Sequence, residues 1–333
     1  MPKADFRWDI ARAAQAACII EATAPKVGNV NRHHDFFDCL LEDFQLSAVA
    51  IGEPLGRVKA QGVGKTVLVA IQATRRVVPT NTNLGIVLLL VPLAMAWSRL
   101  EIGEETAEGE IREIPTGEIP SEPSDSWLRE MTDVLTGLTE EDTRYVYEAI
   151  RLANPGGIGQ ATEHDVNLET SPEITLLEAM RLASDRDLVA REYVNRFHTV
   201  FEVGLPFLEV VLKAGLPLPL AAAETHLYIL SQFPDTLIAR KVGTSLSQEV
   251  QMRAQGVWEK GGFRTEAGRV QTRAFDTWLR EGGHHLNPGA TADITAAILF
   301  VFFLENGLEY WSKTRRGSLT ESLNCMPLDL SMG

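Results

Sequence analysis

Residues 287–304 read NPGATADITAAILFVFFL, and this stretch decides the class of fold. Proline suits the first position of a helix, where its missing N–H leaves no hydrogen bond unmade. The run from Ile294 to Leu304 is apolar except for Thr295 but falls well short of the roughly 20 residues that span a bilayer, so it predicts a buried core helix. Residues 84–97, LGIVLLLVPLAMAW, predict a second buried helix, for which Asn83 is the expected N-terminal cap.

Amphipathic helices are predicted around these two. From Asp9 to Ala22 apolar residues recur at helical spacing, and Thr139 followed by three acidic residues is a typical helix start. Further helices are predicted over residues 40–50, 65–78, 139–154, 172–183, 187–214, 219–231, 245–258 and 263–281. No segment alternates apolar and polar residues as a half-buried strand does. The fold class is therefore all-α.

The predicted domain organisation is one compact helical domain over residues 1–311. An acidic stretch at 101–125, with Gly, Pro, Thr and Ser and few large apolar residues, has the composition of an exposed insertion. Residues 312–333 are predicted to form a loose polar tail.

Charge and composition argue against several functional classes. The net charge of −14 disfavours binding to nucleic-acid backbones, which are held by basic patches. The N-terminus lacks the apolar core and cleavage site of a signal peptide, and three scattered cysteines do not form a disulfide framework. We therefore expect a cytoplasmic protein without a membrane anchor. Polyphosphate metabolites remain compatible with an acidic chain if basic residues and a divalent cation gather locally.

The segment Gly62-Val63-Gly64-Lys65-Thr66 resembles the end of a phosphate-binding P-loop. The full pattern needs a glycine five positions before Gly64. Lys59 stands there, and no apolar strand leads in. A glycine turn before an ordinary helix is the better interpretation, and a phosphate contact of another kind by Lys65 stays open.

A dense group of carboxylates begins just after His33 and His34: Asp35, Asp38, Glu42 and Asp43. Oxygen ligands suit Mg²⁺ bridged to a polyphosphate, whereas two adjacent histidines lack the spacing typical of zinc ligands. A solvated acidic helix start explains the same carboxylates, so both interpretations stay open.

Four polar junctions with glycine or asparagine stand at predicted helix boundaries: PKVGNVNRHHD at 25–35, NTNLG at 81–85, NPGGIG at 154–159 and NPGATAD at 287–293. Small residues at a helix N-terminus let its free N–H groups approach an anion, so several such ends around one cleft would bind phosphates. We expect Gly85, Gly157 and Gly289 to lie near one cleft.

In this order, the junctions resemble motifs of the triphosphoribosyl-dephospho-CoA synthases. PKVGNV resembles their Pro-Lys-Pro-Gly motif, and VPTNTNLG resembles their Asn-Thr-His-Lys-Gly segment. NPGGIGQATEHDV, with the following LLEAMRLASDRDLVAREYV, resembles their Pro-Gly-Gly-Leu-Gly and Asp-Val region. DTLIARKVG at 235–243 and NPGATADITAAILF resemble their Asp-Thr…Arg…Gly segment and closing helix. The resemblance covers about residues 10–307.

The resemblance implies transfer of the 5-triphosphoribosyl group of ATP to the 2′-hydroxyl of 3′-dephospho-CoA with release of adenine, and Mg²⁺ is expected with ATP. Substitution at an anomeric carbon is helped by a base on the incoming hydroxyl and an acid on the leaving nitrogen, and carboxylates can do both. The catalytic candidates are Asp35, Asp38 and Glu42, and the Mg²⁺ candidates are Asp38, Glu42 and Asp165. The substrate-binding candidates are Lys26, Gly28, Asn29, Arg32, His33, Asn81, Thr82, Asn83, Gly85, Gly156, Gly157, Asp235, Arg240, Lys241, Asn287, Gly289 and Asp293.

Departures from the family pattern leave alternatives open. Val27 replaces the usual second proline, and Asn83 and Leu84 stand where many members carry His and Lys. A divergent phosphoribosyl-type transferase in one-carbon carrier cofactor biosynthesis, or a non-catalytic nucleotide-binding helical protein, would fit this loss of a cationic pair. Homo-oligomerisation also stays open.

Overall fold

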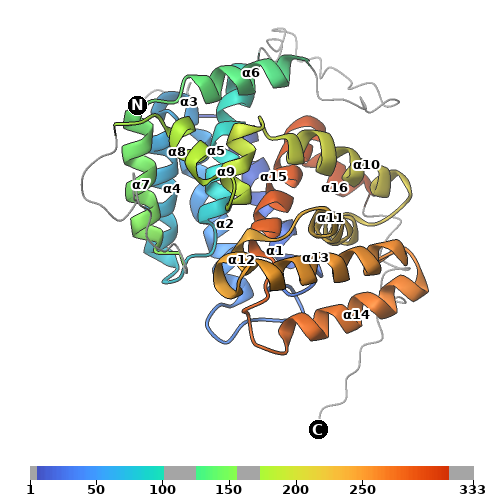
Figure 1. The fold of residues 1–333 in the computed structure, drawn as a ribbon. Coiled ribbons are helices and arrows are strands. Elements are labelled where there is room, and N and C mark those ends of the chain that lie inside the picture. Colours follow the sequence, from blue (N-terminus) through green and yellow to red (C-terminus); the bar gives the residue numbers. More distant parts are fainter. Residues whose placement is uncertain (1–5, 101–124, 156–172, 315–333) are drawn as a thin grey trace.

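The computed structural model describes residues 6–100, 125–155 and 173–314, drawn as ribbons in Figure 1. Within these ranges there are sixteen α-helices, one π-helical turn and no strand. Two isolated antiparallel bridges join Asn31 to His34 and Phe36 to Cys39. The predicted all-α class is confirmed.

The helices of the described ranges follow each other along the chain in this order. The first half of the chain contains α1 (Trp8–Thr23), α2 (Leu41–Gly56), α3 (Val58–Gln61), α4 (Val63–Val77), α5 (Leu84–Arg99), α6 (Asp125–Thr136), α7 (Glu140–Ala153) and α8 (Leu176–Ala183). The second half contains α9 (Leu188–Val194), η2 (Thr199–Gly204), α10 (Leu205–Lys213), α11 (Leu218–Gln232), α12 (Thr236–Val242), α13 (Thr244–Glu259), α14 (Glu266–Arg280), α15 (Gly289–Asn306) and α16 (Glu309–Thr314). Residues 101–124 of the predicted insertion and 315–333 of the predicted tail lie outside the described residues.

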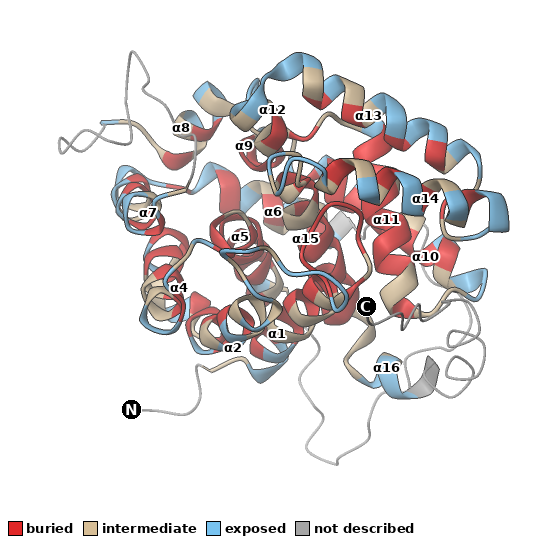
Figure 2. Cartoon of the chain, turned by 90° about the horizontal axis from the view of Figure 1, so that it is seen from below, coloured by how far each residue is buried: buried red, intermediate tan, exposed pale blue. Residues whose placement is uncertain are grey.

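The core is built around α15, whose apolar run is buried as predicted. This helix contacts α1, α5, α9, α10, α11, α12, α16 and η2. By length and composition alone α15 could cross a membrane, but 78% of its apolar window is buried inside the protein. Figure 2 shows buried residues concentrated in α15 and the neighbouring α5. The apolar composition of α15 is accounted for by its central position.

A second, smaller core lies among the helices α11 to α14. It consists of Val27, Leu227, Leu230, Ile238, Val250, Ala254, Val257, Phe275 and Leu279. Val27, which replaces the second proline of the family motif, therefore anchors the loop after α1 to this part of the molecule.

The single helix predicted over residues 187–214 is wrong, because the chain turns inside this range. Arg196 and Phe197 have positive φ angles of 58° and 60°, and α9, η2 and α10 replace one continuous helix. The buried Glu192 carboxylate accepts a hydrogen bond from the Val200 N–H at 3.3 Å, and the Phe197 side chain is fully buried. Burial of Phe197 stabilises a backbone conformation that ordinarily favours glycine.

Smaller differences affect helix ends. Asn83 precedes α5 as predicted, but its side chain does not cap the helix; it donates to Thr74 Oγ1 at 3.0 Å. The Leu84 N–H is satisfied by Asn81 Oδ1 at 3.2 Å instead. Pro288 immediately precedes α15 and does not form its first turn. Residues 312–314 of the predicted tail belong to α16.

Candidate active site

A cleft of about 1030 Å³ lies where the loops before α2, α5 and α15 approach the ends of α8, α9 and α12. The sequence-predicted residues that line it are Lys26, Asn29, Asp38, Asn81, Thr82, Asn83, Gly85, Arg240, Lys241, Asn287, Gly289 and Asp293. The described candidates that do not line it are Gly28, Arg32, His33, Asp35, Glu42 and Asp235. Gly156, Gly157 and Asp165 lie outside the described residues. Gly85 and Gly289 thus share one cleft, and Gly157 stays a prediction.

Asp293 of α15 is the most unusual group in this cleft. No described residue donates a hydrogen bond or forms an ion pair to its carboxylate. It lies against Gly85, where an added Cβ would overlap Asp293 Oδ2, so only glycine lets α5 and α15 approach this closely. Burial raises the pKa of Asp293 well above its usual range, and the negative charge of Glu21 adds to this. Asp293 is therefore a carboxyl group suited to proton transfer.

Glu21 and Lys26 form an ion pair at one wall of the cleft. Their side chains are 5% and 1% exposed, and Lys26 Nζ lies 2.9 Å from Glu21 Oε1. Burial raises the pKa of Glu21, whereas the Lys26 charge lowers it. Glu21 is not among the site residues predicted from the sequence, although it shares the buried face of α1 with Ala17 and Cys18. The pattern that could have identified Glu21 is a carboxylate on an otherwise apolar helix face.

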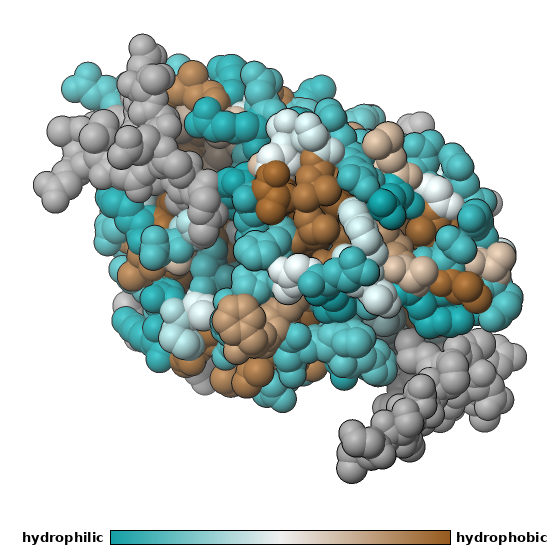
Figure 3. All heavy atoms as spheres, turned by 60° about the horizontal axis from the view of Figure 1, so that its bottom comes forward, coloured by the Kyte–Doolittle hydropathy of each residue, from teal (hydrophilic) through white to brown (hydrophobic). Residues whose placement is uncertain are grey.

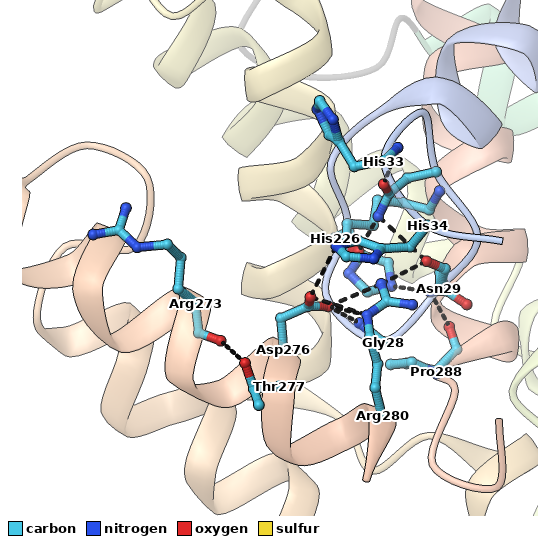
Figure 4. Close-up of polar contacts among 12 residues, drawn as sticks. Gly28, Asn29, His33, His34, His226, Arg273, Asp276, Thr277, Arg280 and Pro288 are labelled. Atoms are coloured by element: carbon cyan, nitrogen blue, oxygen red, sulfur yellow. Dashed lines mark hydrogen bonds and ion pairs between the residues drawn. The ribbon is translucent and has the colours of Figure 1, made fainter. Parts of the chain in front are cut away.

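The loop after α1 is tied to distant elements, as Figure 4 shows. Gly28, at a φ of 70°, donates its N–H to Asp276 Oδ1 at 2.7 Å. The Asn29 side-chain amide donates to the Pro288 carbonyl at 3.3 Å and lies 3.1 Å from His226 Nε2. Asn29 therefore connects the first and last family motifs directly.

The fully buried His226 completes this connection. Burial lowers its pKa to about 3, so the ring is neutral and its Nε2 accepts from the Asn29 amide. Arg280 adds a further bond by donating to the Asn29 carbonyl at 2.7 Å. Gly28 and His226 consequently position the cleft loop without lining the cleft.

Basic side chains from α12 also line the cleft. Lys241 Nζ donates to Asn287 Oδ1 at 2.7 Å and to the His284 carbonyl at 3.1 Å. Arg240 lies 3.4 Å from Asp187 Oδ2. Burial lowers the pKa of Lys241, and the charge of Asp235 opposes this shift. Lining residues that the sequence reasoning missed include Arg75, Arg186, Asp187 and Arg191.

Asp235 does not line the cleft, but it supports the helix that carries Arg240 and Lys241. It is fully buried, and its Oδ1 accepts from the Leu237 N–H at 2.9 Å at the start of α12. Its Oδ2 accepts from the Thr291 N–H at 2.7 Å. Asp235 therefore locks α12 to α15 and fixes the placement of Arg240 and Lys241.

The acidic group after His34 separates into two parts. Asp35 is exposed, and its Oδ1 accepts from the Leu41 N–H at 2.8 Å. Asp43 similarly accepts from the Leu40 N–H at 2.9 Å, and Glu42 is exposed in the first turn of α2. These three form the acidic helix start, whereas Asp38 alone reaches the cleft.

Two other candidates from this loop also lie away from the cleft. Arg32 Nε donates to the Thr23 carbonyl at 3.3 Å. The His33 N–H donates to Asn31 Oδ1 at 2.9 Å, while its exposed ring points away from the network in Figure 4.

The segment that resembles a P-loop is a helix start. Gly62 precedes α4 at a φ of 80°, and Gly64 donates its N–H to Asp142 Oδ1 of α7 at 2.7 Å. An added Cβ at Gly64 would lie only 2.7 Å from the Asp142 carbonyl oxygen. Lys65 is exposed and does not line the cleft. Gly64 thus serves the close packing of two helices.

Two positions at which the resembling sequences often carry His and Lys hold Asn83 and Leu84 here, and both are buried. Asn83 and Leu84 are 4% and 7% exposed, although both line the cleft. No described group of three His, Cys, Asp or Glu side chains is arranged to hold a metal ion. The carboxylates of Asp38, Asp187 and Asp293 do line the cleft, and one or two such oxygens fit Mg²⁺ that is also held by substrate phosphates.

The fold and cleft define an all-α protein with a charged cleft suited to a phosphorylated ligand. The chain belongs to the CitG family, ATP:dephospho-CoA triphosphoribosyl transferase, which it matches over residues 7–312.

Two relatives agree with this assignment. A probable 2-(5″-triphosphoribosyl)-3′-dephosphocoenzyme-A synthase of Pseudomonas syringae pv. tomato is 32% identical over 120 residues, which are 36% of this chain and 40% of that protein. The match thus spans less than half of that relative's length. A crystal structure from Archaeoglobus fulgidus, assigned as a triphosphoribosyl-dephospho-CoA synthase, is 26% identical with a TM-score of 0.55. It covers 78% of this chain and 98% of its own.

Proposed function

We propose that this protein transfers the 5-triphosphoribosyl group of ATP to the 2′-hydroxyl of 3′-dephospho-CoA and releases adenine. The proposal rests on family membership and is carried by one structural observation. The Asp293 carboxyl group, free of hydrogen bonds from described residues, faces the same cleft as Lys241 and Arg240. A proton-transfer group and phosphate-binding cations in one cleft are what this reaction needs.

The raised pKa of Asp293 keeps its carboxyl group protonated at higher pH than usual, so Asp293 acts as the acid. It donates its proton to the leaving adenine as the bond between C1′ and the ring nitrogen breaks. The bond between C1′ and the acceptor 2′-oxygen forms, and Asp38 at the cleft mouth accepts the hydroxyl proton. The transition state has oxocarbenium character, as in other glycosyl transfers.

The triphosphate is held by Arg240 and Lys241, because a guanidinium fork and a point charge both suit anionic oxygens. Lys26 also contributes positive charge to the cleft, although its ion pair with Glu21 reduces its freedom to bind phosphate. Ribose and base are oriented by the polar lining residues Asn29, Asn81, Thr82, Asn83 and Asn287. Asp187, which has no proton-transfer role here, would hold Mg²⁺ together with the phosphates, and the ion would neutralise triphosphate charge.

Residues 1–311 are proposed to work as one transferase domain in the cytoplasm, where ATP and dephospho-CoA are the partners. The acidic charge of the chain supports small nucleotides over nucleic acid as ligands.

The test is chromatographic detection of adenine from ATP and Mg²⁺, with and without dephospho-CoA. We expect adenine release that depends on dephospho-CoA, together with a product whose mass equals that of dephospho-CoA plus the triphosphoribosyl group. Because Gly64 and Lys65 form no phosphate site, inorganic phosphate should not appear at a comparable rate. Absence of the mass product, or adenine release independent of the acceptor, would contradict the proposed function.

A further inference from the structure

A tight turn at the cleft carries an unusually exposed aromatic residue. Phe36 and Cys39 face each other through an antiparallel bridge, with Phe36 N–H donating to the Cys39 carbonyl at 3.0 Å. Phe37 and Asp38 therefore form the tip of this turn. Phe37 is 89% exposed, the highest value among the exposed large hydrophobic residues described.

The turn contacts a second pair of rings from the loop before α15. The His284 ring centre lies 5.2 Å from that of Phe36 and 5.4 Å from that of Phe37, with interplanar angles of 38° and 31°. His285 follows, with its ring centre 5.8 Å from that of His284. We name these four residues the aromatic rim. Phe36 and His284 also line the cleft, so the rim lies at the cleft.

Polar contacts fix the rim next to the groups that bind charge. Lys241 Nζ donates to the His284 carbonyl, which holds a phosphate-binding cation beside the rings. Asp38 Oδ1 lies 3.6 Å from His284 Nδ1. That nitrogen is buried and has no hydrogen-bond partner among the described residues. The rim is therefore a mixed aromatic and polar surface beside the cleft.

We propose that the aromatic rim is a stacking platform for the adenine ring of a nucleotide substrate. Adenine is a flat π-system, and stacking of a base on an aromatic side chain is a strong, geometry-tolerant contact. Covering the exposed Phe37 ring would also remove apolar surface from water. In Figure 3, the lower face of the molecule is mainly hydrophilic, with hydrophobic side chains gathered in small patches. Small patches fit a single base better than a protein interface.

The position of Asp38 assigns this adenine to the acceptor. In the proposed function, on which this assignment rests, Asp38 takes the proton of the 2′-hydroxyl of dephospho-CoA. Because Phe37 precedes Asp38 in the same turn, the adenine attached to the ribose of dephospho-CoA is the one that lies over Phe37. The adenine that leaves ATP lies deeper in the cleft, at Asp293.

The test compares Phe37→Ala and Phe37→Trp with the native protein by calorimetry, using dephospho-CoA, AMP and tripolyphosphate as separate probes. Loss of one stacked base should weaken dephospho-CoA binding about tenfold or more. Phe37→Trp should restore it, and tripolyphosphate binding should not change. Val210→Ala is the control: it removes a hydrophobic side chain that is 61% exposed on α10, and it should leave all three affinities unchanged.

Steady-state kinetics separate the two sources of adenine. A raised KM for dephospho-CoA with an unaltered KM for ATP supports the acceptor assignment, whereas the reverse result overturns it and places ATP on the rim. Unchanged affinity for both dephospho-CoA and AMP in Phe37→Ala overturns the platform, as does a native protein that binds neither. If Phe37→Ala weakens nucleotide binding but the native protein makes no transfer product, the platform stands and the proposed function fails.

Discussion

Asp293 is the residue whose replacement tests the proposed chemistry most directly. Asp293→Asn is nearly isosteric and cannot donate a proton as a carboxylic acid does. We expect turnover in the adenine-release assay to fall about 100-fold or more, the usual contribution of a positioned acid. The melting temperature should be unchanged or higher, because no described residue bonds to the carboxylate that is removed. In the native protein, kcat should decline as pH rises through the raised pKa of Asp293.

Asp35→Asn is the matched comparison, because Asp35 was the sequence-based candidate and the structure places it outside the cleft. The asparagine Oδ1 can still accept the hydrogen bond from the Leu41 N–H, so Asp35→Asn should leave both stability and turnover largely intact. A large loss of turnover in Asp35→Asn with full activity in Asp293→Asn would move the reaction centre to the loop before α2.

At the residue scale, the sequence predicted that the polar junctions at 25–35, 81–85 and 287–293 meet at one cleft, but not how their side chains are used. The Asn-Pro-Gly and Pro-Lys-Val-Gly segments do come together, through Asn29 and the Pro288 carbonyl. Glu21 escaped prediction because its role depends on Lys26 folding back onto α1, a contact that helical periodicity does not encode. Asp187 was not predicted for the same reason, because its carboxylate pairs with Arg240 from a helix distant in the sequence.

At the element scale, the close packing of α4 on α7 gives a prediction about Gly64. In Gly64→Ala the new Cβ would crowd the Asp142 backbone, so we expect a loss of about 1–3 kcal/mol in the free energy of unfolding, measured with urea. KM for ATP should not change. Gly256→Ala in α13, where an added Cβ meets nothing within 4 Å, should instead gain up to about 1 kcal/mol. A higher KM for ATP in Gly64→Ala without loss of stability would restore the phosphate-binding interpretation.

Most elements were predictable because their apolar periodicity is strong, as in α7 and α14. The break after α9 was not, because Arg196 and Phe197 adopt positive φ angles without the glycine or proline that usually marks a turn. The seven residues of α12 are too few for helical periodicity to be clear, so the sequence marks this segment only as part of a motif. Its position depends on buried Asp235, a tertiary contact.

At the scale of the whole molecule, the fold could be predicted because two apolar segments must be buried and no strand pattern competes with them. The smaller core of α11 to α14 could not, since Val27 joins it from a distant part of the chain. Which helices surround α15 is likewise decided by long-range packing. That packing also leaves titratable groups in the interior, and these make the stability of the whole protein depend on pH.

Glu305 near the end of α15 provides a test of this dependence. Burial raises its pKa from 4.5 to about 7, the charge of Glu209 from α10 adds to this, and a hydrogen bond with Trp127 of α6 opposes it. The folded-state pKa is above the unfolded-state value, so the unfolded chain releases this proton first as pH rises. Native stability from this group is therefore complete below pH 4.5 and is lost as pH rises through about 7.

The glutamine side chain in Glu305→Gln cannot ionise, so this variant should not lose stability as the pH rises. We expect urea unfolding at pH 8 to show the variant more stable than the native protein, with an upper limit of about 3 kcal/mol, and the two nearly equal at about pH 4. Glu148→Gln, on the exposed face of α7, is the control for replacing a glutamate with glutamine. A Glu305→Gln variant that is equally stable or less stable than the native protein at pH 8 would mean that the ionised carboxylate is accommodated where α6, α10 and α15 meet. In that case the burial of Glu305 does not limit the stability of the fold.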